Sequence, residues 1–192
     1  MKNAITLDRV TKCYGELRVI DDMSLTIAEN TAIMGASGRG KTTLLRMIAG
    51  IERPDSGEVR FAYKPKLSVV FQEDRLFEDF SAVENVTAII GRDRRTEATD
   101  VLSELLIDPS ELDKPVRDYS GGMKRRVAIA RALLAEHDVL LLDEPFKGLD
   151  EDTRAETARI IREYAHDKLV MLVTHDPREA DLLGIGNVII VE

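Results

Sequence analysis

The sequence is poor in several residue types, and each shortage excludes a class of protein. It contains a single cysteine, Cys13, among 192 residues, so no disulfide can form within the chain and no thiolate metal site is indicated. Its longest apolar runs, such as 139–142 and 169–173, are far shorter than the roughly 20 residues of a membrane-spanning helix. Residues 1–5 also lack the apolar character of a signal peptide. We therefore expect a soluble, intracellular protein.

Positive charge is scarce as well. The chain has 27 lysine and arginine residues against 35 aspartate and glutamate residues, a formal net charge of −8, and it has no long basic run. This balance makes direct binding to nucleic acid or to an anionic membrane surface a poor fit. Hydrophobic residues make up 44% of the chain, which is enough for one sizeable core, with or without a smaller lobe.

The strongest chemical signal is the segment 35–42. It reads Gly-Ala-Ser-Gly-Arg-Gly-Lys-Thr and fits the pattern G-x-x-x-x-G-K-[ST], between an expected buried strand at 31–34 and an expected helix at 43–49. The glycines let successive backbone N–H groups point into one concavity, and the helix start adds the positive end of its dipole. The alternative is a glycine-rich turn that binds nothing, but average residue usage gives such a match a chance of only about one in a hundred.

The pattern assigns a role to each part of this loop. Lys41 would reach the β- and γ-phosphates of a nucleoside triphosphate, and the Thr42 hydroxyl would bind Mg²⁺. The residues expected to hold the nucleotide are Gly35, Ala36, Ser37, Gly38, Arg39, Gly40, Lys41, Thr42 and Thr43. Because kinases, GTPases and motors share this loop, it indicates a nucleotide and no particular reaction.

Strands are predicted on both sides of the loop. The expected strands are 5–10, 18–20, 23–27, 59–63 and 67–71. The early ones are interpreted as an antiparallel sheet, with Tyr14 in a turn whose ring could simply pack on a strand. Gln72 directly follows the last of them and, taken alone, is an ordinary polar residue at the end of a strand.

Between Glu73 and about Asp118 the sequence becomes charged with helical periodicity. Ser81 and Glu84 have the spacing of a capping box at the start of a helix. One apolar helix stripe consists of Ala98, Val101, Leu102, Leu105 and Leu106, and it should end at 108–109. We interpret this region as a separate helical lobe. After it, Ser120 has the character of an N-cap, and the two glycines that follow it permit close approach of a ligand.

Carboxylates and a histidine follow two strands that are predicted to be buried. The apolar run 139–142 leads directly into Asp143 and Glu144, and the run 169–174 leads into His175. Ligands of open α/β sheets bind at the carboxyl ends of strands, so we expect Asp143 to bind Mg²⁺ and Glu144 to accept a proton from the attacking water. A solvated turn is the alternative for the acids, and a structural role is the alternative for His175.

In this order, the motifs resemble the nucleotide-binding subunit of an ABC transporter over essentially the whole chain. The matching segments are Tyr14, the Walker A loop 35–42, Gln72 in Val-Val-Phe-Gln, the signature-like stretch 119–123, Walker B at 142–145, the D-loop 148–150 and His175. The resemblance implies that Tyr14 stacks on adenine and that Gln72 senses Mg²⁺ and faces a membrane partner. It implies that His175 contacts the γ-phosphate.

The resemblance also implies the architecture and the partners. The fold would be α/β: a P-loop NTPase (RecA-like) core with a mixed sheet, a small antiparallel β lobe and an inserted helical lobe at about 74–137, all within one domain, 1–192. Ser120, Gly121 and Gly122 would face the γ-phosphate of ATP bound to a second subunit, in a head-to-tail homodimer. Integral membrane permease subunits would be direct partners, a solute-binding protein an indirect one, and nucleic acid none. The ATPase would lie in the cytoplasm on the inner face of the membrane.

The segments 71–76 and 144–146 further resemble the ATPases of bacterial importers for nitrate, sulfonates and taurine. Two features depart from the family pattern: Tyr119 and Met123 replace the usual leucine and glutamine of the signature, and the stretch 57–72 is short, which predicts a trimmed antiparallel lobe. The competing interpretations are a soluble ABC-type ATPase that acts on nucleic acid or ribosomes, and a small-molecule kinase.

Overall fold

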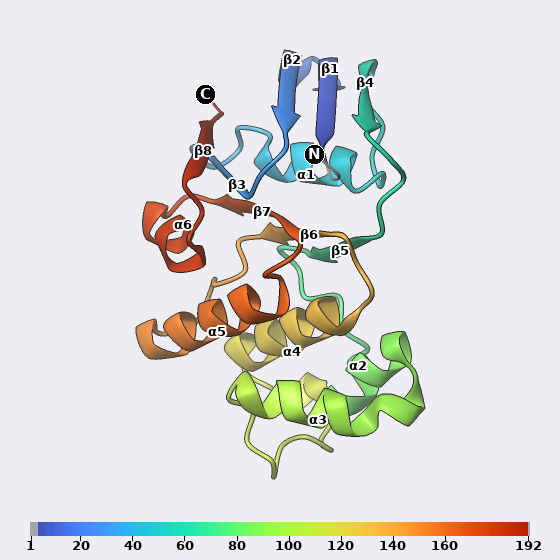
Figure 1. Ribbon diagram of the computed structural model, residues 1–192, viewed down its shortest axis with the longest axis vertical. Helices are drawn as coiled ribbons and strands as arrows, with labels where there is room; N and C mark the ends of the chain where they lie inside the picture. The colour runs from blue at the N-terminus through green and yellow to red at the C-terminus, as the bar shows by residue number, and fades with distance from the viewer. Residues whose placement is uncertain (1–3, 192) are drawn as a thin grey trace. The chain divides into compact units, whose positions relative to one another are not determined.

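The computed structural model describes residues 4–191, and the chain divides into two compact units (Figure 1). The first unit comprises residues up to 69, residues 137–143 and residues from 167 onward. The second unit comprises 70–136 and 144–166. The polypeptide therefore passes between the units four times, and one of these passages is the peptide bond between Asp143 and Glu144.

The first unit contains a three-stranded antiparallel sheet in the order β2-β1-β4. Its strands are β1 (Ile5–Tyr14), β2 (Leu17–Ile27) and β4 (Ser56–Phe61). The segments 18–20 and 23–27, predicted as two strands, are one continuous strand whose register against β1 shifts around Asp22, which has a φ of 44°. The two acidic residues that interrupt the apolar alternation therefore mark an irregularity within the strand rather than a turn.

The second sheet has five strands in the order β5-β6-β7-β3-β8. They are β3 (Thr31–Met34), β5 (Leu67–Val70), β6 (Val139–Asp143), β7 (Leu169–Thr174) and β8 (Asn187–Ile190), and the pairs β6–β7, β7–β3 and β3–β8 are parallel. Every residue of β3, β6 and β7 is buried, as expected for near-continuous apolar strands in a covered parallel sheet. This confirms the predicted α/β class.

Two helices belong to the first unit, α1 (Lys41–Ile48) and α6 (Pro177–Leu183). The α1 helix contacts β6 and β7, and its buried side chains, including Leu44, Leu45 and Ile48, join apolar residues of both sheets in a single core. The segment 35–42, which the sequence predicts to bind a nucleotide, leads directly into α1. We call it the nucleotide loop. The core therefore fixes the direction in which the start of this helix points.

The second unit is helical. It consists of α2 (Ala82–Ile90), α3 (Arg95–Glu104), α4 (Gly121–Leu134) and α5 (Glu151–Tyr164), with short 3-10 turns at Arg92–Arg94 and Val116–Asp118. The predicted capping box is present: Glu84 N donates to Ser81 Oγ at 3.1 Å, and Ser81 N donates to Glu84 Oε2 at 2.8 Å. Within residues 4–191, no helix has the length and apolar character required to span a bilayer.

One predicted helix end is wrong. The apolar stripe was expected to run through Leu106 to Asp108, but α3 ends at Glu104. Leu106 has a left-handed φ of 60° and an exposed side chain, and Ile107 N donates back to Leu102 O at 3.0 Å to close the helix. The helical spacing of Leu106 therefore arises by coincidence in a residue that terminates the helix.

Candidate functional site

Three sequence-predicted elements leave the same edge of the parallel sheet in the first unit. In register, Met34 of β3 lies beside Thr174 of β7, and Val173 of β7 lies beside Asp143 of β6. The loop after β3, His175 after β7 and Asp143 at the end of β6 therefore share the carboxyl edge of three adjacent strands. Neighbouring strands are about 4.8 Å apart, so the loop and Asp143 start about 10 Å apart, with His175 following the strand between them. This is the edge at which open α/β sheets bind ligands.

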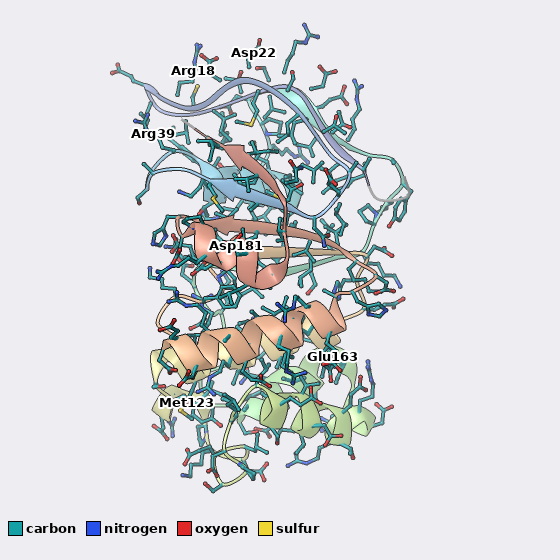
Figure 2. All side chains as sticks on the ribbon, turned by 60° about the vertical axis from the view of Figure 1, so that its left-hand side comes forward. Arg18, Asp22, Arg39, Met123, Glu163 and Asp181 are labelled. Atoms are coloured by element: carbon teal, nitrogen blue, oxygen red, sulfur yellow. The ribbon has the colours of Figure 1, made fainter. Side chains whose placement is uncertain are left out.

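Two glycines of the loop are required by close packing. At Gly35, with φ at 155°, an added Cβ would lie 2.3 Å from Val191 O; at Gly40, with φ at 82°, it would lie 2.9 Å from Val19 O. Real side chains do not occupy such spaces, and positive φ values also favour glycine. Between them the chain is exposed, and in Figure 2 the Arg39 side chain extends outward from the loop. The backbone of residues 36–39 is therefore accessible to a ligand.

The start of α1 has the features of an anion site. Gly40 is the N-cap and supplies no side-chain hydrogen bond, and the first turn, Lys-Thr-Thr-Leu, contains no acid. The first N–H groups of a helix have no acceptor within the helix, and they lie at the positive end of its dipole. Lys41, which is buried, folds back so that its Nζ donates to Gly35 O and Ala36 O, both at 2.8 Å. The third donor of the ammonium group is left for a ligand.

Asp143 and Glu144 are adjacent in sequence but differ in surroundings. Asp143 is the last residue of β6 and is 0% exposed, whereas the Glu144 side chain is 19% exposed in the second unit. Glu144 has a left-handed φ of 47°, which costs a non-glycine residue roughly 1–2 kcal/mol. Its Oε2 accepts from Gln72 Nε2 at 3.3 Å and lies 3.9 Å from Lys147 Nζ. Unfavourable backbone conformations of this kind are typical of functional positions. Nothing in the sequence predicted this one.

The signature-like stretch begins α4. Ser120 is its N-cap, as predicted, and Ser120 Oγ accepts from Met123 N at 3.2 Å. Ser120 and Gly121 are exposed, and a Cβ at Gly122 would lie 3.2 Å from Gly148 O, so this glycine permits contact with the D-loop. Figure 2 labels Met123 in the first turn of the helix.

Tyr119, which departs from the family pattern, has a structural function. It is buried, and its hydroxyl donates to Glu111 O at 2.6 Å. Burial raises the pKa of this phenol to about 12, so it remains a donor at neutral pH. The substitution for leucine thus ties the stretch before α4 to the preceding loop and leaves Ser120, Gly121 and Gly122 unobstructed.

Tyr14 lies beside the nucleotide loop. Its hydroxyl donates to Glu52 Oε1 at 2.5 Å, and Lys12 Nζ lies 5.6 Å from the centre of its ring. Partial burial, then the bond to Glu52, raise the pKa of Tyr14, while an interaction with Thr43 in the first turn of α1 lowers it. Tyr14 is 46% exposed, so it has accessible aromatic surface on which a base could stack.

The sequence profile of the ABC transporter family matches residues 20–147. The chain belongs to the ABC transporter family. Among curated family members, it is similar to the aliphatic sulfonates import ATP-binding protein SsuB 2 of Paraburkholderia xenovorans, with 42% identity covering 92% of this chain and 72% of the relative. It is also similar to the sulfate/thiosulfate import ATP-binding protein CysA of Salmonella typhi, with 39% identity over 92% of this chain and 55% of the relative.

Solved structures of family members have the same fold. The dimeric structure of MJ0796, a bacterial ABC transporter cassette, has a TM-score of 0.85 and 29% identity, with coverage of 97% of this chain and 94% of that one. A second structure of the same cassette, a dimeric post-hydrolysis state bound to ADP and Pi, has the same TM-score and identity. The ABC transporter fold predicted from the motif order is therefore confirmed, while the role of each site residue stays a prediction.

The sequence did not predict the contacts of two residues in the second unit. Arg125 and Arg131 of α4 donate to backbone carbonyls of the segment that follows β5 and includes Gln72. In the sequence they belong to a charged, amphipathic helix, and the sequence analysis assigned them no contact. Residues 72–75 are Gln-Glu-Asp-Arg, with no apolar side chain, but nothing in the sequence places them against this helix.

Proposed function

We propose that this chain is the ATP-binding and ATP-hydrolysing subunit that powers transport of a small solute by a separate membrane permease, most simply an importer. The observation that carries the proposal is the shared carboxyl edge of β3, β7 and β6, which gathers the uncapped start of α1, His175 and Asp143. The relatives are named for the import of aliphatic sulfonates and of sulfate or thiosulfate, which supports a small anionic solute.

The residues present fit ATP with Mg²⁺. Exposed loop backbone, the open helix start and the Lys41 ammonium suit a phosphate chain, and the exposed Tyr14, which interacts with Thr43, offers aromatic surface beside them. Thr42 in the first turn and the buried Asp143 carboxylate would hold Mg²⁺. When bound, Mg²⁺ would neutralise charge on the phosphate oxygens.

Hydrolysis would depend on Glu144. Its carboxylate would accept a proton from water aligned with the γ-phosphate, and Gln72, which already donates to Glu144 Oε2, would hold this carboxylate in place. Lys41 and His175 would stabilise negative charge on the γ-phosphate as it is transferred.

The partners follow from the exposed start of α4. Ser120 and Gly121 are exposed at the start of α4, and we propose that they and Gly122 complete the ATP site of a second copy of this chain. The related cassette is a dimer in both solved structures, which supports this arrangement. Permease subunits would bind the complex at the inner face of the membrane, with a solute-binding protein acting indirectly.

Two alternatives fit less well. An ATPase acting on nucleic acid or ribosomes would need a surface that attracts phosphates, whereas this chain has a net charge of −8. A small-molecule kinase would leave Gln72, the signature-like stretch and His175 without a role. Copurification of the tagged chain with a membrane protein, as opposed to RNA, separates the first alternative from the proposal.

The direct test is Glu144→Gln. Loss of a general base lowers turnover by about 10²–10⁴-fold, so phosphate release should nearly stop while ATP binding persists. Glu163→Gln is the matched control, because Glu163 is an exposed residue of α5 that pairs with Arg159 on the surface (Figure 2). Unchanged turnover in Glu144→Gln would remove Glu144 from the mechanism. The same variant should change from monomer to dimer when ATP is added, as measured by light scattering.

A further inference from the structure

A pair of arginines on α4 holds the backbone around Gln72. Arg125 Nη1 donates to Phe71 O and Arg125 Nη2 donates to Gln72 O, both at 2.5 Å. Six residues further along the helix, Arg131 donates to Asp74 O at 3.0 Å and to Arg75 O at 2.9 Å. Four carbonyl groups within five residues are therefore bound by two guanidinium groups of one helix. We name this arrangement the arginine clamp.

The geometry of Arg125 depends on its guanidinium group. Two N–H groups of the planar fork bind two successive carbonyls, an arrangement that an ammonium group cannot reproduce. The Arg125 side chain is 5% exposed, and Nη1 also lies 3.2 Å from Asp74 Oδ1. A buried cation is tolerated only when it is paired and hydrogen-bonded, and Asp74 with the two carbonyls provides this.

Asp74 is the matching half of the pair. Burial raises the pKa of its carboxyl group, and Arg125, Lys124 and Arg131 act in the opposite direction and favour the carboxylate. Burial likewise lowers the pKa of Arg131, with Asp74 opposing. Burial of the Asp74 carboxylate or of either arginine alone would therefore be unfavourable, and burial of the charges together is acceptable. This pairing fixes the segment 71–75 against one position along α4.

The clamp joins the start of α4, which would face the ATP site of a second copy, to the Gln72 and Glu144 pair of this chain's own site. Gln72 is bound at its carbonyl by Arg125, and its side chain donates to Glu144 Oε2 at 3.3 Å. Arg125 lies five residues after Ser120, on the same 14-residue helix. Because Ser120 and Arg125 belong to one continuous helix, a displacement of the start of α4 would also move Arg125 and the Gln72 carbonyl that it binds.

We propose that Arg125, paired with Asp74, is a positioning residue that links the start of α4 to Gln72 and thereby sets the contact between Gln72 and Glu144. This inference rests on the proposed function as an ATPase. The alternative is that the clamp only stabilises the fold of the second unit.

The test is a double-mutant cycle with Arg125→Lys and Gln72→Ala. Residues that orient others at a reactive centre are typically worth about 10–100-fold, so Arg125→Lys should lower kcat by about this factor while KM for ATP stays unchanged. In the Gln72→Ala background the same change should have no further effect, because the group that it positions is gone. Equal, additive losses in both backgrounds would overturn the proposal in favour of a structural role.

Arg159→Lys is the control. Arg159 of α5 is paired on the surface with Glu156 and Glu163, so the same change of side chain should leave kcat unchanged. Asp74→Asn keeps the carbonyl contacts and removes only the charge; it should give a smaller loss in kcat and serves if Arg125→Lys does not fold.

Amide hydrogen exchange tests the clamp without any ATPase assay. Arg125→Lys should speed exchange in residues 71–76 and leave α2 unchanged. Faster exchange with unchanged kcat would reduce the clamp to a structural contact, and unchanged exchange would refute it. A wild-type chain that binds no ATP would instead contradict the proposed function, so the two failures are distinguishable.

Discussion

Asn85→Ala should destabilise the second unit far more than its size suggests. Asn85 of α2 is 0% exposed and binds the loop that precedes the helix. Its Oδ1 accepts from Phe77 N at 2.8 Å, and its Nδ2 donates to Phe77 O and Ser81 O, both at 3.0 Å. These bonds hold the exposed, tilted pair of rings Phe77 and Phe80, whose centroids are 5.3 Å apart.

The expected loss of stability depends on which backbone groups keep a hydrogen-bond partner in the variant. Phe77 O also accepts from Phe80 N, and Ser81 O also accepts from Asn85 N, so these carbonyls stay bonded in the variant. The Phe77 N–H loses its acceptor, at about 1–3 kcal/mol, and the two 3.0 Å bonds of Asn85 Nδ2 contribute about 0.5–1.5 kcal/mol each. Because solvent can reach part of this loop, we expect a total loss of about 2–4 kcal/mol.

Thr87→Val on the same helix is the matched control. Thr87 Oγ1 donates to Val83 O at 2.9 Å, and this carbonyl retains its place in the helix when the hydroxyl is removed. No polar group is left without a partner, so the loss should stay below about 1 kcal/mol.

Thermal and urea unfolding, followed by circular dichroism, measure both variants. A chain of this size loses roughly 2–4 °C in Tm per kcal/mol, so Asn85→Ala should melt about 4–16 °C below the wild type. Because the chain has two compact units, near-UV and far-UV signals should both be followed to test for a single transition. An Asn85→Ala loss no larger than that of Thr87→Val would show that these bonds contribute no net stability.

Three further predictions concern the first unit and the signature-like stretch. Gly35→Ala places a Cβ 2.3 Å from Val191 O and should abolish soluble expression or ATP binding, whereas Gly38→Ala, whose Cβ meets no described atom within 4 Å, should cost only the roughly 1–2 kcal/mol of a left-handed residue. Lys41→Ala should lose ATP binding in an equilibrium titration; tight binding by this variant would contradict the role of the loop. Because the pKa of Tyr119 rises from 10.0 to about 12 on folding, the stability it contributes is complete below pH 10 and is lost as the pH rises toward 12. Tyr119→Phe should reduce this alkaline loss, as followed by unfolding at several pH values, and an identical profile would argue against burial of the phenol.

Local sequence patterns predicted the features that depend only on residues close together in the sequence. The loop 35–42, the capping box of Ser81 with Glu84 and the buried strand that ends at Asp143 all depend on residues within a few positions of one another. The motif order was sufficient to predict the family, which the comparison with known proteins confirmed.

Contacts between distant residues could not be predicted in this way. The bond from Arg125 to Gln72 O spans 53 residues, and a buried arginine on a charged helix has the same sequence pattern as a solvated one. The bond from Tyr14 to Glu52 spans 38 residues and joins two unremarkable polar positions. The left-handed backbone of Glu144 is likewise a property of the folded chain, since glutamate has no preference for it.

The two sheets also differ in when they can form. All strands of the antiparallel sheet lie within residues 5–61, so it can assemble as soon as this part of the chain has been synthesised. The strand β3, by contrast, has both of its neighbours, β7 and β8, more than 130 positions downstream, as the pair Met34 and Thr174 illustrates. Such non-local pairing is slow, and an unpaired apolar strand is prone to aggregate. The strand that precedes the loop 35–42 therefore remains unpaired at both edges until β7 and β8 have been synthesised.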